Sequence, residues 1–360
     1  MKKSLKRGIA FVITLHFFFS AIGQEASYTP PALADSNSWS MILLPDPQTY
    51  VKFSRNQPIF ELMTSWISEN IQPLHIEMVL CTGDLVEQNN ILKADDKNGN
   101  QPSINQWKSV SNSFRRLDGK VPYIAATGNH DFGFKSAENR ETDYDTYFPV
   151  NKNSKTQVLL KEVGLNIHNR PSLTNAAYEL IDPQGIKYLF MVLEFAPHDG
   201  TIAWAKEVVN KPAYTEHRVV LLTHSYLNAN NEHIETEGYK VQNPNYGKAI
   251  WEKLVKPSKN ILLVFSGHIG APDDEKAHIA FRTDTNAAGK KVQQMTFNAQ
   301  ALGGGWHGNG GDGWLRILEF LPDGKTISVK TFSPLFAISP ATQGLAWRKK
   351  DYDEFSFQLD

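Results

Sequence analysis

Residues that can bind a metal ion follow five apolar segments of the chain, each at the point where the segment ends. Asp46 follows MILLP, Asp84 follows VLCTG, Asn129 follows IAATG, His224 follows VVLLT, and His268 follows LLVFSG. Carboxylate, amide oxygen and imidazole groups together suit Mn²⁺, iron and Zn²⁺. The pattern therefore indicates a metal site assembled from residues that lie far apart in the sequence.

Each of these residues also has an ordinary structural explanation when it is taken alone. A single Asp after a strand is more often a helix cap or a turn residue, and a single His is more often hydrogen bonded within the core. Capping does not explain five such residues in succession, each at the end of an apolar segment. We therefore favour the metal interpretation for the group as a whole.

The elements that would position these residues follow from the hydrophobic pattern. Short apolar segments alternate with amphipathic ones, which predicts an α/β fold with buried parallel strands. Ligands gather at the carboxyl ends of strands in such sheets, and the five residues stand there. The predicted helices cover about 57–71, 103–117, 200–210 and 246–256.

The last part of the sequence changes character. From about residue 279 the apolar segments read as strands joined by short turns, and Asp323-Gly324 predicts a hairpin between two of them. Residues beyond about 335 show no pattern other than coil with a few packing aromatic residues. We expect one domain with a late antiparallel section.

Composition excludes several classes of function. The 360 residues include 37 basic and 38 acidic side chains, so nothing favours capture of nucleic acid or of an anionic membrane surface. The chain has no Gly-x-Gly-x-x-Gly motif after the first strand and no complete Gly-x-x-x-x-Gly-Lys-Ser/Thr motif, because Gly324-Lys325-Thr326 lacks the earlier glycine; this removes support for a dinucleotide-binding or P-loop enzyme. The single cysteine, Cys81, lies in the apolar segment EMVLCTGD and is expected to be buried.

The N-terminus has the pattern of a secretory signal peptide. Four basic residues precede the apolar run 8–21, and the small residues Ala21 and Gly23 stand at the −3 and −1 positions of a cut before Gln24. We expect a signal peptide over 1–23, a leader over 24–38, one domain over 39–335 and a C-terminal tail over 336–360. This organisation predicts a secreted or periplasmic bacterial protein without a membrane anchor after cleavage.

Taken in order, these motifs give the sequence a family resemblance over about residues 40–270. It resembles the calcineurin-like metallophosphoesterases, whose pattern runs Asp-x-His, Gly-Asp, Gly-Asn-His-Asp/Glu, a single His and Gly-His-x-His. The counterparts here are Asp46-Pro47-Gln48, Gly83-Asp84, Gly128-Asn129-His130-Asp131, His224 and Gly267-His268-Ile269-Gly270. The resemblance implies an α/β four-layer sandwich, in which two mixed β-sheets are flanked by helices. It also implies hydrolysis of phosphate mono- or diesters by metal-activated hydroxide.

The resemblance further implies two metal positions, for one or two divalent transition-metal ions such as Mn, Fe or Zn. One position uses Asp84, Asn129, His224 and His268, which are all present. The other uses Asp46, the histidine of Asp-x-His, Asp84 and the last histidine of Gly-His-x-His. Here Gln48 replaces the first of those histidines and Gly270 the second. Glycine has no side chain to offer, and an amide oxygen is a weaker ligand for Zn²⁺ or iron than imidazole.

The remaining site predictions concern substrate. By resemblance, His130 stabilises a phosphate oxygen or gives a proton to the leaving group, and Asp131 orients its imidazole. The glycine-rich segment ALGGGWHGNGGDGWLR predicts a loop near the site, from which His307 contacts substrate or fills the second metal position. Asn89, shortly after Asp84, is a candidate for the rim.

Two classes of function stay open. The first is a metal-dependent phosphoesterase with a small-molecule phosphate ester as substrate. The second is a member that binds metal and a phosphorylated ligand with little or no turnover, or with slow turnover at a single ion. The intact His130-Asp131 pair favours the enzyme, because a protein that only binds has no use for a poised acid.

Overall fold

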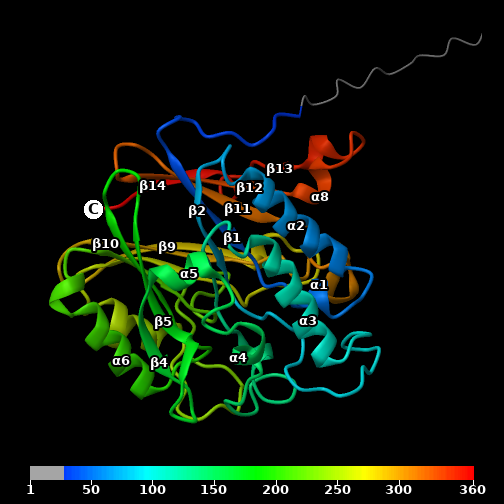
Figure 1. Ribbon diagram of the computed structural model, residues 1–360, viewed down its shortest axis with the longest axis horizontal. Coiled ribbons are helices and arrows are strands. Elements are labelled where there is room, and N and C mark those ends of the chain that lie inside the picture. The colour runs from blue at the N-terminus through cyan, green and yellow to red at the C-terminus, as the bar shows by residue number, and fades with distance from the viewer. Residues whose placement is uncertain (1–27) are drawn as a thin grey trace, which may run out of the picture.

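Two seven-stranded mixed β-sheets, flanked by helices, form the body of the protein (Figure 1). A computed structural model describes residues 28–360. The predicted signal peptide and the first residues of the predicted leader lie outside the described residues. Within residues 28–360, no helix has the length and apolar character needed to cross a bilayer.

The first sheet carries three of the predicted strand ends. Its order is β13-β12-β11-β1-β2-β3, and β14 pairs with β12. β1, β2 and β3 are parallel, whereas β11 runs antiparallel to β1. The strands are β1 (Trp39–Leu44), β2 (Ile76–Cys81), β3 (Tyr123–Ala125), β11 (Leu315–Phe320), β12 (Thr326–Phe332), β13 (Trp347–Arg348) and β14 (Phe355–Gln358).

The second sheet carries the other two strand ends. Its order is β4-β5-β6-β7-β8-β10-β9, with a parallel centre from β6 to β10 and antiparallel strands at both sides. The strands are β4 (Leu160–Leu165), β5 (Pro171–Ile181), β6 (Lys187–Val192), β7 (Arg218–Leu222), β8 (Ile261–Ser266), β9 (Ile279–Thr285) and β10 (Lys291–Phe297).

Helices cover the outer faces of the sheets (Figure 1). The α-helices are α1 (Gln48–Val51), α2 (Gln57–Asn70), α3 (Ser103–Phe114), α4 (Tyr144–Tyr147), α5 (Ser154–Leu159), α6 (Asp199–Val209), α7 (Gly247–Ile250) and α8 (Pro334–Ala337). A π-helix, η4 (Trp251–Val255), continues α7. In α2 the buried residues Phe60, Met63 and Ile67 fall on one face at helical spacing and pack into the core of the first sheet.

The alternation of side chains in the strands explains why the layers hold together. In β7, Val220 and Leu222 pack into the main core, while Val219 and Leu221 point to the opposite face and pack into a second apolar cluster with α6. A fully buried aliphatic side chain stabilises the fold by about 1.5–3 kcal/mol relative to exposure. A strand buried on both faces therefore holds its end, and the ligand that follows, in a fixed place.

The predicted α/β fold of two mixed sheets with flanking helices is confirmed. Each of the five apolar segments that precede the predicted ligands contains a strand, and β11 and β12 form the hairpin expected at Asp323-Gly324. Two features differ from the prediction. β4 and β5 had no clear pattern, because small and polar residues interrupt the segment PSLTNAAYELI. The C-terminal residues are not coil, because β13 and β14 pair with β12.

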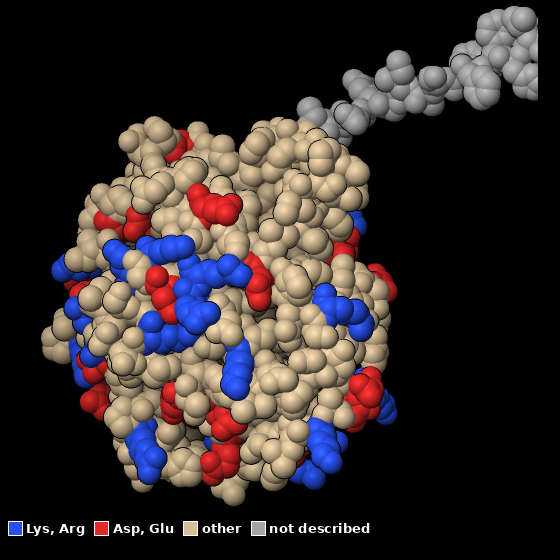
Figure 2. Space-filling model, turned by 45° about the vertical axis from the view of Figure 1, so that its right-hand side comes forward, with Lys and Arg blue, Asp and Glu red and all other residues tan. Residues whose placement is uncertain are grey.

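The surface carries charges of both signs. Figure 2 shows Lys and Arg gathered on part of one face, with Asp and Glu among them.

Cys81 is buried at the end of β2, as expected, and burial raises the pKa of its thiol.

Candidate metal centre

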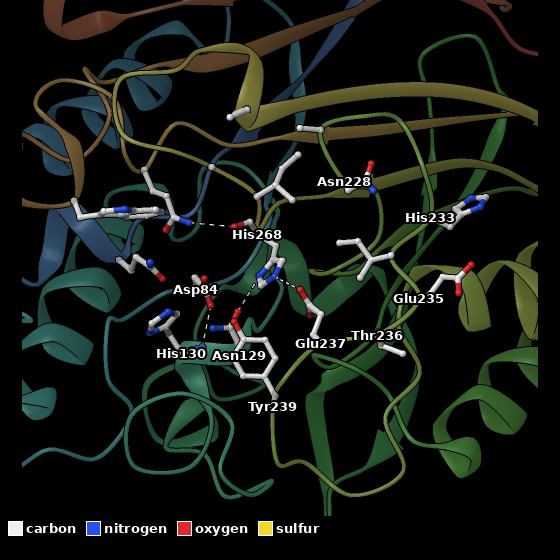
Figure 3. A pocket seen from close by; sticks show the side chains of 18 of the residues that line it. Asp84, Asn129, His130, Asn228, His233, Glu235, Thr236, Glu237, Tyr239 and His268 are labelled. Carbon is white, nitrogen blue, oxygen red and sulfur yellow. Dashed lines mark hydrogen bonds and ion pairs between the residues drawn. The ribbon is translucent and has the colours of Figure 1, made fainter.

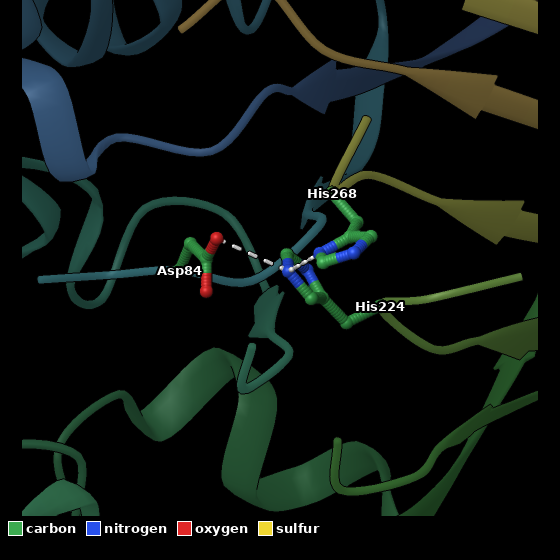
Figure 4. A group of neighbouring side chains, drawn as sticks. All are labelled: Asp84, His224 and His268. Atoms are coloured by element: carbon green, nitrogen blue, oxygen red, sulfur yellow. Dashed lines mark hydrogen bonds and ion pairs between the residues drawn. The ribbon is translucent and has the colours of Figure 1, made fainter. Parts of the chain in front are cut away.

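Loops that follow β2, β3, β7 and β8 bring four side chains together, although the strands belong to two different sheets. Figure 4 shows three of them, Asp84, His224 and His268. The ligand atoms of Asp84, His224 and His268 all lie within 4.8 Å of one another. Asn129 completes the group, because its Oδ1 lies 3.2 Å from Nε2 of His224 and 3.0 Å from Nδ1 of His268. We call Asp84, Asn129, His224 and His268 the metal centre.

The separations within the metal centre suit a transition-metal ion. Nε2 of His224 lies 3.2 Å from Oδ2 of Asp84 and 3.2 Å from Nδ1 of His268. Metal–ligand bonds of about 2.1 Å place neighbouring ligands about 3.0 Å apart in an octahedron and about 3.4 Å apart in a tetrahedron. The four residues therefore fit a divalent ion without rearrangement.

Hydrogen bonds around the metal centre turn the lone pairs of its residues inward. Nδ1 of His224 lies 2.8 Å from the Thr82 carbonyl and must donate to it, so Nε2 is the ring nitrogen that faces the centre and offers its lone pair to an ion when the imidazole is neutral. The amide nitrogen of Asn129 donates to Ser136 at 2.8 Å, so Oδ1 faces the centre. Fixed tautomers and orientations of this kind are typical of metal sites, because each ligand needs an outer partner to hold it.

His268 has a carboxylate as its outer partner. Its Nε2 lies 2.5 Å from Oε1 of Glu237, so Nδ1 is left to face the other ligands (Figure 3). Oε2 of Glu237 accepts a hydrogen bond from Ser225 at 2.9 Å. Glu237 was missed in the sequence, because it lies in an irregular segment where no periodicity marks it.

The charges of the site are coupled. Burial lowers the pKa of His224, but the carboxylates of Asp84 and Asp46 outweigh it and raise the pKa to about 10. Burial alone would raise the pKa of Asp84, yet the cationic His224 and His130 beside it lower the pKa overall. Without an ion, the centre thus holds positive charge as a proton on His224.

The backbone at these strand ends takes strained conformations and leaves little room for further side-chain atoms. Asp84 and His268 both have positive φ, of 46° and 76°, which non-glycine residues adopt at a cost of about 1–3 kcal/mol. Of the glycines that precede these ligands, Gly83 has a positive φ of 117°, whereas Gly128 and Gly267 do not. They are needed for room: a Cβ on Gly128 would overlap Oδ1 of Asp84, and one on Gly267 would overlap Oδ1 of Asp46.

A cavity of about 1270 Å³ opens directly onto the metal centre, and His130 lies on its wall (Figure 3). Nδ1 of His130 lies 2.6 Å from the Glu87 carbonyl, and its backbone N–H donates to Oδ1 of Asp84. Burial lowers the pKa of His130, but Asp84 and Glu87 outweigh it and the pKa is raised. Lys52, which sequence reasoning did not single out, lines the same wall and pairs with Glu87 at 3.1 Å.

The contacts of Asp131 differ from those that the sequence predicted. Asp131 does not orient His130; its carboxylate accepts the backbone N–H groups of Leu85, Val86 and Gly128 and so fixes the loop that carries Asp84. Burial and the charge of Asp84 raise the pKa of Asp131 to about 7. The carbonyl of Glu87 holds His130 in its place.

Asn89 lies away from the cavity wall. Its buried amide donates to the Gly133 carbonyl at 2.8 Å and accepts the N–H of Asp143 at 3.0 Å. A side chain whose groups are paired in this way has a structural role, and the prediction that it binds substrate gains no support from its contacts.

The other predicted site residues lie near the metal centre without joining it. Gln48 lines the cavity, whereas Asp46 is fully buried behind it, and burial raises the pKa of Asp46 to about 6. His307 also lines the cavity; its ring packs 5.8 Å from that of Phe53, and its carbonyl accepts a hydrogen bond from Arg55. A role of His307 in binding substrate stays a prediction.

One curated bacterial protein is similar in sequence to most of this chain. The uncharacterized protein YvnB of Bacillus subtilis (strain 168) is 29% identical over 341 residues, which cover 92% of this chain and 22% of that protein. The chain thus spans about a fifth of the length of this curated relative.

Two solved structures that align with most of this chain have low sequence identity to it. A dimetal phosphatase from Danio rerio has a TM-score of 0.47 at 9% identity, covering 89% of this chain and 99% of its own. GAP50 from the inner membrane complex of Plasmodium has a TM-score of 0.44 at 12% identity, covering 90% and 89%.

The family assignment rests on the match to a family model. The family model for calcineurin-like phosphoesterases matches residues 46–272, which is more than half of the chain and includes every residue of the metal centre. The protein belongs to the calcineurin-like phosphoesterase family.

Proposed function

We propose that the protein is a metal-dependent phosphoesterase that hydrolyses a small-molecule phosphate ester at the metal centre, after export from the cell. The observation that carries the proposal is the convergence of a carboxylate, an amide oxygen and two imidazoles beside a large cavity, with four of the separations between their ligand atoms at 3.0–3.2 Å. Acceptor atoms at such distances repel one another unless a proton or a metal ion lies between them.

A divalent ion bound there supplies Lewis acidity, which withdraws charge from a phosphoryl oxygen and makes a bound water more acidic. The residues of the chain do the positioning. His224 and Asn129 are held by Thr82 and Ser136, and this fixes the geometry of the centre before substrate arrives. Positioning of this kind is the main contribution that a protein makes to phosphoryl transfer.

His130 is the proposed acid. Its Nδ1–H donates to the Glu87 carbonyl, and its Nε2 is the ring atom left for the cavity beside Asp84. A proton on Nε2 would pass to the leaving-group oxygen, or form a hydrogen bond to a phosphoryl oxygen. The raised pKa of His130 supports this role, because an acid must hold its proton near the working pH.

Lys52 supports the binding of an anion at the same wall. Its ammonium is buried, lines the cavity and lies 3.1 Å from Oε2 of Glu87, so an anion would share the Lys52 charge with that carboxylate. The cavity, at about 1270 Å³, leaves room for a leaving group of substantial size and does not select between monoesters and diesters.

Hydrolysis of a chromogenic monoester and a chromogenic diester by metal-stripped and metal-reloaded protein tests the proposal. We expect turnover only with metal, and its loss in Asp84→Asn and His224→Ala. The matched control is His217→Asn, which changes a buried histidine that is paired with Glu179 and lies outside both the metal centre and the cavity lining. Metal-loaded protein that hydrolyses neither ester, nor a panel of nucleotides and sugar phosphates, would favour the alternative of a protein that binds phosphorylated ligands without turnover.

Export is supported by the sequence pattern of residues 1–23. N-terminal sequencing of the mature protein from a bacterial host should begin at Gln24. A mature chain that begins at Met1 or Lys2 would contradict this part of the proposal.

A further inference from the structure

The carboxylate of Asp46 is occupied by hydrogen bonds from the protein. Its Oδ1 accepts from the hydroxyl of Thr82 at 2.6 Å. Its Oδ2 accepts from the backbone N–H of His268 at 2.8 Å and from the amide of Asn298 at 2.6 Å. Three of the roughly four lone pairs of this carboxylate are therefore used.

Asn298 cannot turn its oxygen toward Asp46. Its Oδ1 accepts the backbone N–H groups of Ala299 at 2.7 Å and Gln300 at 3.1 Å, so the NH₂ group must face the carboxylate. The amide thus occupies a lone pair of Oδ2 that Asp46 would otherwise offer to a cation. Rotating the amide by half a turn would leave the N–H groups of Ala299 and Gln300 without their acceptor, which costs free energy.

Gly270 lines the cavity, but a side chain at this position would begin against His278. A Cβ at this position would lie 2.7 Å from Nε2 of His278. His278 is itself committed: its Nδ1 donates to the Asp274 carbonyl at 2.7 Å, and its Nε2 accepts the N–H of Ala301 at 3.2 Å. With both ring nitrogens engaged, His278 fills the space next to Gly270 and cannot serve as a ligand in its place.

Asp84, which the family pattern shares between both positions, is engaged on both oxygens, with Oδ1 on the His130 N–H and Oδ2 beside His224. Apart from Asp84 and the loop residue His307, the side chains that the family pattern leaves for the second position are neutral amides. Oε1 of Gln48 and Oε1 of Gln300 are buried, and each has no hydrogen-bond partner within residues 28–360. Two amide oxygens without a free carboxylate or imidazole are a poor donor set for Mn²⁺, iron or Zn²⁺. They suit N–H or O–H donors, such as a water or a hydroxyl group of the substrate.

We propose that the protein holds one transition-metal ion per chain, in the metal centre, and that Asn298 and His278 close the position that the family pattern gives to a second ion. The proposal rests on the proposed function only in taking the metal centre as a site for an ion. Asp46 then acts as a positioning residue: it holds the backbone of His268 and does not bind metal.

Metal content of the wild-type chain tests this directly. Protein dialysed against excess Mn²⁺ and freed of loose ions is analysed by elemental mass spectrometry, and its electron paramagnetic resonance spectrum is recorded. We expect one Mn²⁺ per chain with the spectrum of an isolated ion. Two ions per chain, or the spectrum of a spin-coupled pair, would overturn the one-ion inference and leave the proposed function standing. No bound ion would overturn both.

The substitution Asn298→Asp tests the role of Asn298. The new carboxylate can still accept the N–H groups of Ala299 and Gln300, but it places a second negative charge against Asp46, and the metal content should rise from one ion to two. The control is Asn228→Asp, which adds the same charge to another part of the same cavity and should leave the content at one. An unchanged content in Asn298→Asp, or an equal rise in the control, would refute the role given to Asn298.

Discussion

Binding of the metal ion should release a proton from His224. In the metal-free protein Nδ1 of His224 donates to Thr82, and a second proton on Nε2 faces Oδ2 of Asp84 at 3.2 Å. Burial lowers the pKa of this imidazole, but the two carboxylates raise it to about 10. A metal ion needs the lone pair of Nε2, so it must displace that proton.

The size of the effect follows from the distance between the pKa and the working pH. At about pH 8 the proton is held two pH units below its pKa, so it weakens metal binding ~100-fold, or about 2.7 kcal/mol. The affinity should rise about tenfold per pH unit toward pH 10. About pH 8 is the useful starting point, because Asp46 and Asp131, with pKa values of about 6 and about 7, are ionised there.

The stability of the metal-free protein should also depend on pH through His224. The pKa of His224 is raised on folding, so its contribution to the stability of the metal-free protein is present below about pH 6.5 and is lost as the pH rises toward 10. The metal-loaded protein should lack this dependence, because its His224 is already neutral.

Isothermal titration calorimetry in buffers of different ionisation enthalpy measures the released protons. The two proteins compared are His130→Asn and the double variant His130→Asn/His224→Gln. The shared substitution removes the other histidine whose pKa is raised, so its proton does not contribute. We expect about one proton more from the protein that keeps His224. Equal proton release in the two proteins, together with an affinity that does not change between pH 8 and pH 10, would refute the reasoning.

Three further predictions follow from single contacts. Glu237→Gln keeps an acceptor for Nε2 of His268 but removes its charge, and chelator competition should show metal affinity weakened by about 10-fold or more. His130→Asn should keep the metal content and lower kcat, with the larger loss for esters of poor leaving groups in a series of substituted phenyl esters. Asn89→Ala should lower the free energy of unfolding by about 1–3 kcal/mol in urea and leave KM unchanged, because the Gly133 carbonyl and the Asp143 N–H lose their partner.

Each of these has an outcome that would contradict it. A metal affinity in Glu237→Gln equal to that of the wild type would show that the contact with His268 does not tune the ion. A uniform loss of kcat across leaving groups in His130→Asn would argue against proton donation. A rise in KM without loss of stability in Asn89→Ala would restore the substrate role that the structure does not support.

The sequence predicted the metal centre because its residues obey a general rule of position. Asp84, Asn129, His224 and His268 each follow a strand, and the carboxyl ends of parallel strands meet at one edge. Their apolar strands are long enough to be recognised, so the order of ligands could be read without knowing how the two sheets pack.

The partners of those ligands could not be predicted in the same way. Glu237 and Asn298 lie outside regular elements, and their contacts with His268 and Asp46 depend on how distant loops fold back. Backbone acceptors are hidden for another reason: the carbonyl that holds His130 belongs to Glu87, and every residue has such a group. The strands β13 and β14 are short and lie at an edge, where pairing rather than hydrophobic pattern decides the structure.

The most direct test of the account is a crystal of the protein grown with Mn²⁺ and inorganic phosphate, measured at an X-ray energy where manganese scatters anomalously. We expect one anomalous peak within about 2.0–2.3 Å of Asp84, Asn129, His224 and His268. A phosphate oxygen should lie on the ion, with Nε2 of His130 within hydrogen-bond distance of the phosphate. An ion held by other residues, or a phosphate bound away from both the ion and His130, would contradict the account.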